Sequence, residues 1–146
     1  MDDTSKGQKS LGDLRSDTLE PGLTAELQTT VTSGNTAKHL GSGDSQVFAT
    51  PAMIMLMERA AARLTAAHLP PGLASVGIGV NIRHLAATPL GMTVTAKVKL
   101  VQVQGRKLTF QVEAFDDQEK IGEGTHERMI IDVARFTEKV KRKLSA

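Results

Sequence analysis

The chain has 146 residues, of which 40% are hydrophobic, and a formal net charge of +2 at pH 7. This length suits one domain with a single hydrophobic core. The absence of cysteine excludes disulfides and thiolate metal sites, and no apolar stretch approaches the roughly 20 residues that a membrane helix needs. We therefore expect a cytoplasmic protein without a membrane partner.

The first twenty residues are polar and rich in Asp, Ser, Lys and Gly. They lack the apolar segment of a secretory signal, so we expect a flexible leader over residues 1–20 and one folded domain over residues 21–146. At the start of that domain, residues 23–32 carry β-branched side chains and predict a strand. Residues 34–46 are typical of a polar loop.

A long helix is predicted from Thr50 to residue 68. Thr50 is expected to be its N-cap, with Pro51 at the first helical position and the Pro-Pro-Gly sequence at residues 70–72 ending it. Apolar side chains at spacings of three and four predict one buried stripe along this helix. The stripe consists of Met53, Leu56, Met57, Ala60, Ala61 and Leu64. Ile54 and Met55 widen it, so the N-terminal half should be buried on most sides.

Glu58 directly follows the unbroken apolar run of residues 51–57 inside this helix. An ionised carboxylate in apolar surroundings must find a hydrogen-bonding partner or take up a proton. Such an environment is also how proteins prepare an acid-base group. Glu58 is therefore the first candidate for a catalytic residue.

After the helix the hydrophobic period changes to two. Strands are predicted at residues 74–84, 92–103, 107–115 and 121–133, separated by turn signals. The order is one strand, one long helix and four consecutive antiparallel strands, so we predict an α+β domain with one antiparallel sheet. A meander of this kind can bury a single apolar helix by curling around it, which is the hotdog fold.

Two polar residues at the ends of these elements are further candidates. His84 ends a predicted strand, where its imidazole could act as a base or as a donor to a carbonyl, or could simply be satisfied by backbone groups. The Thr50 hydroxyl could cap the helix. It could also contact a polarised carbonyl at the helix N-terminus, where backbone amides favour an oxyanion.

Arg128 is the candidate on the last predicted strand. Strand alternation places it on the same face as His126. It could bind a phosphate or a carboxylate, or form an ion pair with Glu58 or Glu127. The basic run at residues 139–143 is expected to be a solvated helix end. No nucleic-acid partner is expected, because the chain has no Trp, no Tyr and only four Phe to stack on bases.

Helix geometry bears on how these groups could cooperate. Eight residues of regular helix rise about 12 Å, so Thr50 and Glu58 of one chain cannot hydrogen-bond to each other. A pocket that uses both residues needs a second chain. We therefore predict a homodimer, whose subunits share a site across a two-fold interface, and leave open its further assembly into a tetramer.

Three motifs lie in this part of the chain. Val-Phe-Ala-Thr50 is followed eight residues later by Glu58, His84 begins His-x-Ala-Ala-Thr-Pro-x-Gly, and Gly-x-Gly-Thr-His-Glu-Arg ends at Arg128. In their order and spacing, residues 47–128 resemble the hotdog-fold acyl-CoA thioesterases related to fluoroacetyl-CoA thioesterase. The resemblance extends more loosely over residues 23–141.

The resemblance implies hydrolysis of an acyl-CoA thioester with Thr50, Glu58 and His84 as the catalytic set. It also implies that Gly77 lends its backbone near the thioester and that Arg128 supports the site. His84 would activate water or the Thr50 hydroxyl, and Glu58 would orient the imidazole or attack directly. No cofactor is implied, and the four scattered histidines do not support a metal site.

The loop before the helix departs from the family pattern. The fluoroacyl enzyme carries aromatic residues there, whereas residues 41–46 contain none. We therefore expect a short or polar acyl group. Arg83 is another departure, which could bind a carboxylate or a CoA phosphate, or face solvent. Two alternatives stay open: a non-catalytic module that binds acyl-CoA or an acyl carrier, and a hotdog hydratase, although the Asp-x4-His pair of the hydratases is not evident.

Overall fold

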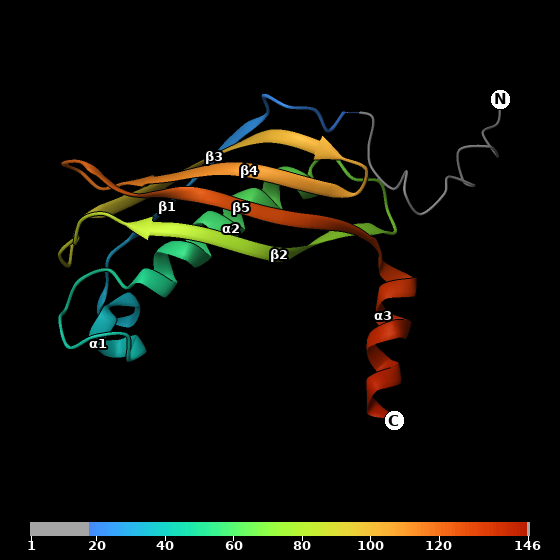
Figure 1. Ribbon diagram of the computed structural model, residues 1–146. Helices are drawn as coiled ribbons and strands as arrows, with labels where there is room; N and C mark the ends of the chain where they lie inside the picture. Colours follow the sequence, from blue (N-terminus) through green and yellow to red (C-terminus); the bar gives the residue numbers. More distant parts are fainter. Residues whose placement is uncertain (1–17, 146) are drawn as a thin grey trace.

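The computed structural model describes residues 18–145, which form a curled antiparallel sheet over one long helix (Figure 1). The strand order in the sheet is β1-β3-β4-β5-β2, and every neighbouring pair is antiparallel. The strands are β1 (Thr24–Thr30), β2 (Leu73–His84), β3 (Thr93–Gln104), β4 (Lys107–Phe115) and β5 (Lys120–Asp132).

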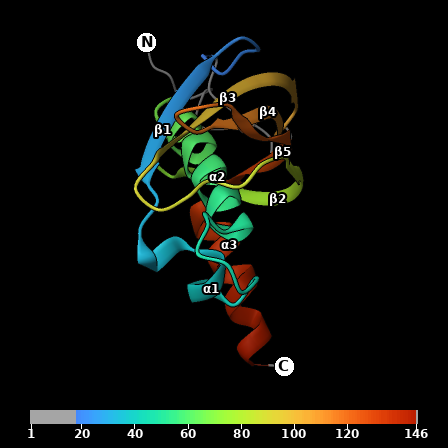
Figure 2. The same cartoon turned by 90° about the vertical axis from the view of Figure 1, so that its left-hand side faces the viewer.

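The long helix α2 (Thr50–Ala66) lies in the concave side of the sheet, as the end-on view in Figure 2 shows. Every residue of the predicted apolar stripe is buried, because α2 packs this stripe against the inward side chains of the strands. The inward side chains of β3 and β4 are Val94, Ala96, Val98, Leu100, Leu108, Phe110, Val112 and Ala114. The predicted α+β architecture is confirmed.

The predicted meander is wrong in one respect. β3, β4 and β5 are consecutive neighbours, but β2 pairs with β5 at the far edge and does not pair with β3. The linker over residues 85–92 crosses the end of the sheet, where the Phe48 amide donates to the Thr88 carbonyl at 2.9 Å. The hydrophobic period identifies a strand but does not show which other strand it pairs with. The sequence alone therefore could not predict the pairing of β2 with β5.

The segment predicted as a polar loop, residues 34–46, is partly helical. It contains part of a 3₁₀ turn (Ser33–Asn35) and the short helix α1 (Ala37–Leu40). The Thr36 hydroxyl accepts a hydrogen bond from the His39 amide at the start of α1, and Gly41 ends the helix in the left-handed conformation, with φ of 74°. These are ordinary capping residues, and they stabilise one helical turn within the loop.

The N-terminal half of α2 is less buried than predicted. Met55 is 56% exposed in the single chain, because the sheet covers only one side of the helix. The predicted leader lies outside the described residues up to residue 17. Leu19 belongs to the hydrophobic core with 1% exposure, so packing begins before the predicted boundary at residue 21. Within residues 18–145 no helix has the length and apolarity needed to cross a membrane.

Gly124 of β5 lies where the strand approaches β2 closely. A Cβ atom there would come within 2.9 Å of the Ile82 Cα and would also overlap the Asn81 backbone. We expect Gly124→Ala to lower the free energy of unfolding by about 2 kcal/mol, because backbone atoms cannot move aside cheaply. In urea denaturation the control is Gly43→Ala, whose Cβ would lie 3.6 Å from the Ala37 Cβ. Equal stability of the two variants would contradict this packing.

Candidate active site

The Thr50 hydroxyl and the His84 imidazole form the first part of the site. Helix α2 begins at Thr50, but its N-cap is Ala49, which makes no side-chain capping bond. The prediction that Thr50 caps the helix is therefore wrong. Its side chain is free to turn toward the end of β2, where Thr50 Oγ1 lies 2.6 Å from His84 Nδ1.

The His84 ring is held in a partly dehydrated setting. Its Nε2 atom is buried and has no hydrogen-bond partner within the described part of the chain. Burial lowers the pKa of His84 below 6.5 and outweighs an opposing contribution from the Ala86 backbone. A neutral imidazole can accept a proton from a hydroxyl, so this contact suits activation of a nucleophile.

These two side chains open into a cavity of about 360 Å³. It lies at the N-terminus of α2, where first-turn amides and the positive end of the helix dipole favour a developing negative charge. The other lining residues are Ala37, Ser42, Val47, Phe48, Leu85, Ala86 and Ala87. The cavity can therefore accept a small group with a polarised carbonyl.

Glu58 and Arg128 form the second part of the site. Arg128 Nη1 lies 3.6 Å from Glu58 Oε2, so of the two ion pairs considered for Arg128 the one with Glu58 forms, while Glu127 pairs with Lys107 at 3.2 Å. The Glu58 side chain is 45% exposed. The prediction that it is enclosed by apolar packing is wrong for a single chain, because β2, the strand beside it, is the edge of the sheet.

Gly77 allows the carboxylate to approach the sheet. A Cβ atom at this position would overlap the Glu58 carboxylate and would lie 3.4 Å from Arg128 Nη1. The β2–β5 register shifts between Gly77 and Gly79, so β2 is irregular at this point. A side chain at this position would therefore displace the Glu58 carboxylate from β2.

The Arg128 guanidinium is buried and fixed from three sides. Its Nε donates to Ser75 Oγ at 2.8 Å, its Nη2 donates to the Ser75 carbonyl at 3.0 Å, and its Nη1 lies 3.2 Å from His126 Nε2. Because arginine only donates, His126 Nε2 must accept and Nδ1 must carry the proton, which it donates to the Gly79 carbonyl at 2.9 Å.

Burial is the main cause that lowers the pKa of His126, and the charge of Arg128 adds to it. The neutral ring therefore serves as an acceptor for the guanidinium, which in turn faces Glu58. Sequence reasoning placed His126 on the correct face of the strand but gave it no role, and it missed Ser75. The available signal was the spacing of two between His126 and Arg128, two polar residues on a buried strand face.

One chain does not bring the three predicted catalytic residues together. Thr50 and Glu58 are separated by about 12 Å along α2, and His84 follows Gly77 by seven residues, or about 23 Å along β2. Arg83 is apart from both clusters. It lines a different cavity of about 520 Å³ on the outer face of the sheet, together with Glu113 and Lys120.

Comparison with known proteins identifies the family of the chain. The family described as fluoroacetyl-CoA-specific thioesterase, FlK, matches residues 31–134. The chain belongs to this family. It is a thioester hydrolase of the acyl-CoA class, as its motifs predicted. The alternatives of a non-catalytic binding module and of a hydratase do not agree with this membership.

Three relatives illustrate the similarity. A fluoroacetyl-CoA thioesterase from Streptantibioticus cattleyicolor is 46% identical over 101 residues, which cover 69% of this chain and 73% of that protein. A Phe→Ala variant of FlK, solved with fluoroacetate and CoA, is 38% identical with a TM-score of 0.76, covering 81% of this chain and 99% of the other. A hot-dog-like protein from Thermanaerovibrio acidaminovorans is 22% identical with a TM-score of 0.79, over 84% and 91% of the two chains. The hotdog prediction is confirmed.

Proposed function

We propose that this family member hydrolyses an acyl-CoA with a short or polar acyl group, using Thr50, His84 and Glu58 as its catalytic set. The observation that carries the proposal is the 2.6 Å contact between Thr50 Oγ1 and His84 Nδ1 at the N-terminus of α2. A hydroxyl beside a neutral imidazole, close to helix amides, is an arrangement suited to acyl transfer.

The chemistry follows from the positions of these groups. His84 Nδ1 accepts the proton of the Thr50 hydroxyl as Oγ1 attacks the thioester carbonyl, and the first-turn amides of α2 stabilise the oxyanion. The C–S bond then breaks, and the thiolate of CoA takes the proton from the imidazolium. Water next hydrolyses the acyl-threonine, with His84 again as the base. Glu58 stabilises the charged imidazolium.

An alternative route has the Glu58 carboxylate or a water molecule as the first nucleophile. Acid quenching during turnover, followed by mass spectrometry of peptides, separates these routes. Both residues lie in the peptide of residues 39–59, so fragmentation of this peptide must assign the acyl group to one side chain. The proposed route leaves the acyl group on Thr50, and an acyl group on Glu58 would contradict it.

A panel of acyl-CoAs with a thiol reagent tests the function itself. The panel contains acetyl, glycolyl, fluoroacetyl and long-chain acyl groups. We expect release of CoA from the short and polar acyl groups, without a preference for fluoroacetyl, because residues 41–46 contribute no aromatic side chain. Absence of free thiol above background with every acyl group would refute the proposal.

A second copy of the chain completes the site. The outer edge of β2 has no partner strand within residues 18–145, and Ile78 and Val80 on it are 48% and 50% exposed. Exposed apolar edge strands pair readily with another strand. Antiparallel pairing of two β2 strands about a two-fold axis brings the His84 end of one strand toward Glu58 and Gly77 of the other. A cytoplasmic location and a tetramer stay predictions.

The dimer gives a first prediction about assembly. We expect wild-type protein to scatter light as a dimer and Val80→Lys to scatter as a monomer with little hydrolytic activity, because two lysines would face each other across the interface. Lys99→Glu, a charge change on a strand distant from β2, is the control and should stay dimeric. An active Val80→Lys monomer would contradict a shared site.

The pH dependence gives a second prediction. The His84 base is active when neutral, and burial lowers its pKa below 6.5. Activity should therefore persist as the pH falls through 6.5 and decline only at lower pH, where the imidazole takes up a proton. We expect the acid limb of kcat/KM to have its midpoint below 6.5. A midpoint above 6.5 would contradict this assignment.

A further inference from the structure

The C-terminal helix α3 (Val133–Lys141) and the 3₁₀ turn after it (Arg142–Leu144) contribute no side chain to the hydrophobic core. They project from the end of β5, away from the sheet (Figures 1 and 2). Every residue from 133 to 145 is exposed. Nearly all of this segment lies outside residues 31–134, which match the family. The family match therefore assigns no role to this segment.

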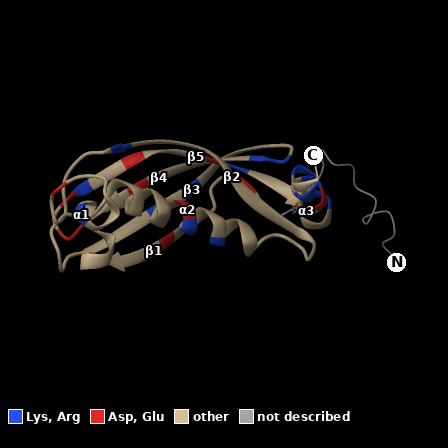
Figure 3. Cartoon of the chain, turned by 90° about the horizontal axis from the view of Figure 1, so that it is seen from below, with Lys and Arg blue, Asp and Glu red and all other residues tan. Residues whose placement is uncertain are grey.

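The segment is strongly basic. It carries five basic side chains against one acidic side chain, Glu138, and Figure 3 shows this concentration of positive charge at one end of the chain. The basic residues are Arg135, Lys139, Lys141, Arg142 and Lys143. None of them forms an ion pair within the described residues. A cluster of unneutralised cations of this kind attracts a polyanion.

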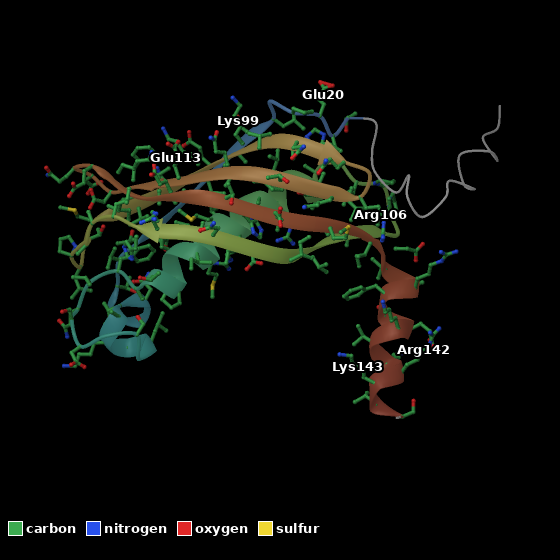
Figure 4. The ribbon with its side chains drawn as sticks, in the orientation of Figure 1. Glu20, Lys99, Arg106, Glu113, Arg142 and Lys143 are labelled. Atoms are coloured by element: carbon green, nitrogen blue, oxygen red, sulfur yellow. The ribbon has the colours of Figure 1, made fainter. Side chains whose placement is uncertain are left out.

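One face of α3 combines these charges with apolar surface. This face carries Phe136, Lys139 and Val140 of α3 and Lys143 of the turn after it. Lys139 and Val140 follow Phe136 by three and four residues, and Lys143 follows them by four and three, so all four lie on one side. Phe136 is 38% exposed and Val140 is 50% exposed. Figure 4 shows Lys143 extending from the turn after α3 into open space. An aromatic ring beside two ammonium groups suits a ligand that joins a flat base to phosphates.

The distance from the Glu58–Arg128 cluster to the basic residues of α3 is comparable to the length of the pantetheine arm of CoA. Asp132 follows Arg128 by four residues, or about 13 Å of strand, and Lys139 follows Asp132 by about 10 Å of helix. α3 turns away from the strand, so the direct path is shorter than both steps together. The extended pantetheine arm of CoA joins its thioester to its phosphates over a span of this order.

We propose that α3 and the turn after it bind the nucleotide end of CoA, with Lys139 and Lys143 on its phosphates and Phe136 and Val140 against the adenine. This rests on the proposed function, which places the thioester between Thr50 of one subunit and Glu58 and Gly77 of the other. The α3 in question belongs to the subunit that supplies Glu58 and Gly77. α3 thereby makes the enzyme selective for thioesters of CoA over thioesters that lack the nucleotide.

The test compares acetyl-CoA with S-acetylpantetheine, which has the same thioester but no phosphates or adenine. For the double variant Lys139→Glu/Lys143→Glu we expect the KM for acetyl-CoA to rise about ten-fold, as lost surface charge pairs would cause. Its kcat and its KM for S-acetylpantetheine should not change. Phe136→Ala should raise the KM for acetyl-CoA alone.

The matched control is Lys97→Glu/Lys99→Glu, which makes the same charge change on β3, at a position away from α3 (Figure 4 labels Lys99). An unchanged KM for acetyl-CoA in the α3 variant, or an equal rise for both substrates, would overturn the proposal. Loss of binding to phosphatidylserine vesicles with an unchanged KM would also overturn it and identify α3 as a membrane-surface helix.

Isothermal titration of the protein with free CoA and with free pantetheine tests the α3 proposal independently of the proposed function. If wild-type protein hydrolyses neither substrate, the proposed function fails. The α3 proposal is then still decided by affinity, because it requires the double variant to bind CoA about ten-fold more weakly and pantetheine equally well. Equal CoA affinity of wild type and variant would refute it.

Discussion

His84→Ala is expected to lower the kcat of acyl-CoA hydrolysis by about 10²- to 10⁴-fold, the range typical of a lost general base. The physical reason is that Thr50 Oγ1 loses the imidazole that lies 2.6 Å away and keeps a proton that it cannot release at neutral pH. The fold should persist, because the ring stands at a strand end and Nε2 makes no hydrogen bond within residues 18–145. We expect the melting temperature to change by about 2 °C at most.

A thiol-release assay and thermal denaturation check this expectation. His68→Ala is the matched control, because His68 Nδ1 also contacts a threonine hydroxyl, that of Thr18 at 2.8 Å, but lies at the opposite end of α2. The control should hydrolyse acyl-CoA at the wild-type rate. A collapse of the melting temperature in His84→Ala, with turnover per folded molecule unchanged, would show that His84 is structural.

Glu58→Gln is expected to lower kcat by about 10²-fold or more while the protein keeps its fold. The amide has nearly the same shape as the carboxylate and still fits against Gly77, but it has no negative charge to stabilise an imidazolium. The lost ion pair with Arg128 is partly exposed, so its contribution to stability is about 1 kcal/mol or less. Kinetics and urea denaturation of the same preparation measure both quantities.

The control for this variant is Glu127→Gln. Glu127 neighbours Arg128 in sequence, but its partner is Lys107, and both side chains are more than a third exposed. Removing its charge should leave kcat unchanged. If Glu58→Gln turns over acyl-CoA at the wild-type rate, Glu58 has no part in the mechanism and only Thr50 and His84 remain in the catalytic set.

The sequence predicted the features that depend on residue spacing along one helix or one strand. The stripe from Met53 to Leu64 is buried as expected, because side chains at spacings of three and four lie on one side of any regular helix. The Glu58–Arg128 pair was also among the alternatives, since a carboxylate on an inner helix needs a cation. The strands were placed to within two residues at each end because their period of two is clear.

The features that sequence could not predict depend on contacts between distant segments. The sequence around Thr50 is typical of a helix N-cap. Only the position of β2 in the fold shows that the Thr50 hydroxyl contacts His84 instead. Glu58 follows an apolar run and reads as buried, but the sheet ends beside it. Ser75 and His126 hold Arg128 through contacts across neighbouring strands, which no spacing along a single strand specifies.

The structure of one chain explains why the site is divided. Thr50 and His84 meet at one end of α2, and Glu58, Gly77 and Arg128 meet two turns further along it. The cluster of Thr50 and His84 contains the proposed nucleophile and its base. The other cluster contains the Glu58 carboxylate and the buried guanidinium of Arg128, which holds that carboxylate in place. In the dimer that we propose, two-fold pairing through β2 would place each cluster opposite the complementary cluster of the other subunit.

Mixing two inactive variants tests this account most directly. Glu58→Gln and His84→Ala proteins are unfolded together and refolded, so that half of the dimers contain one subunit of each kind. If each site takes Glu58 from one subunit and His84 from the other, every mixed dimer regains one intact site, and the mixture recovers about a quarter of wild-type activity. Recovery of no activity, with mixed dimers verified by mass spectrometry, would contradict a site shared between subunits.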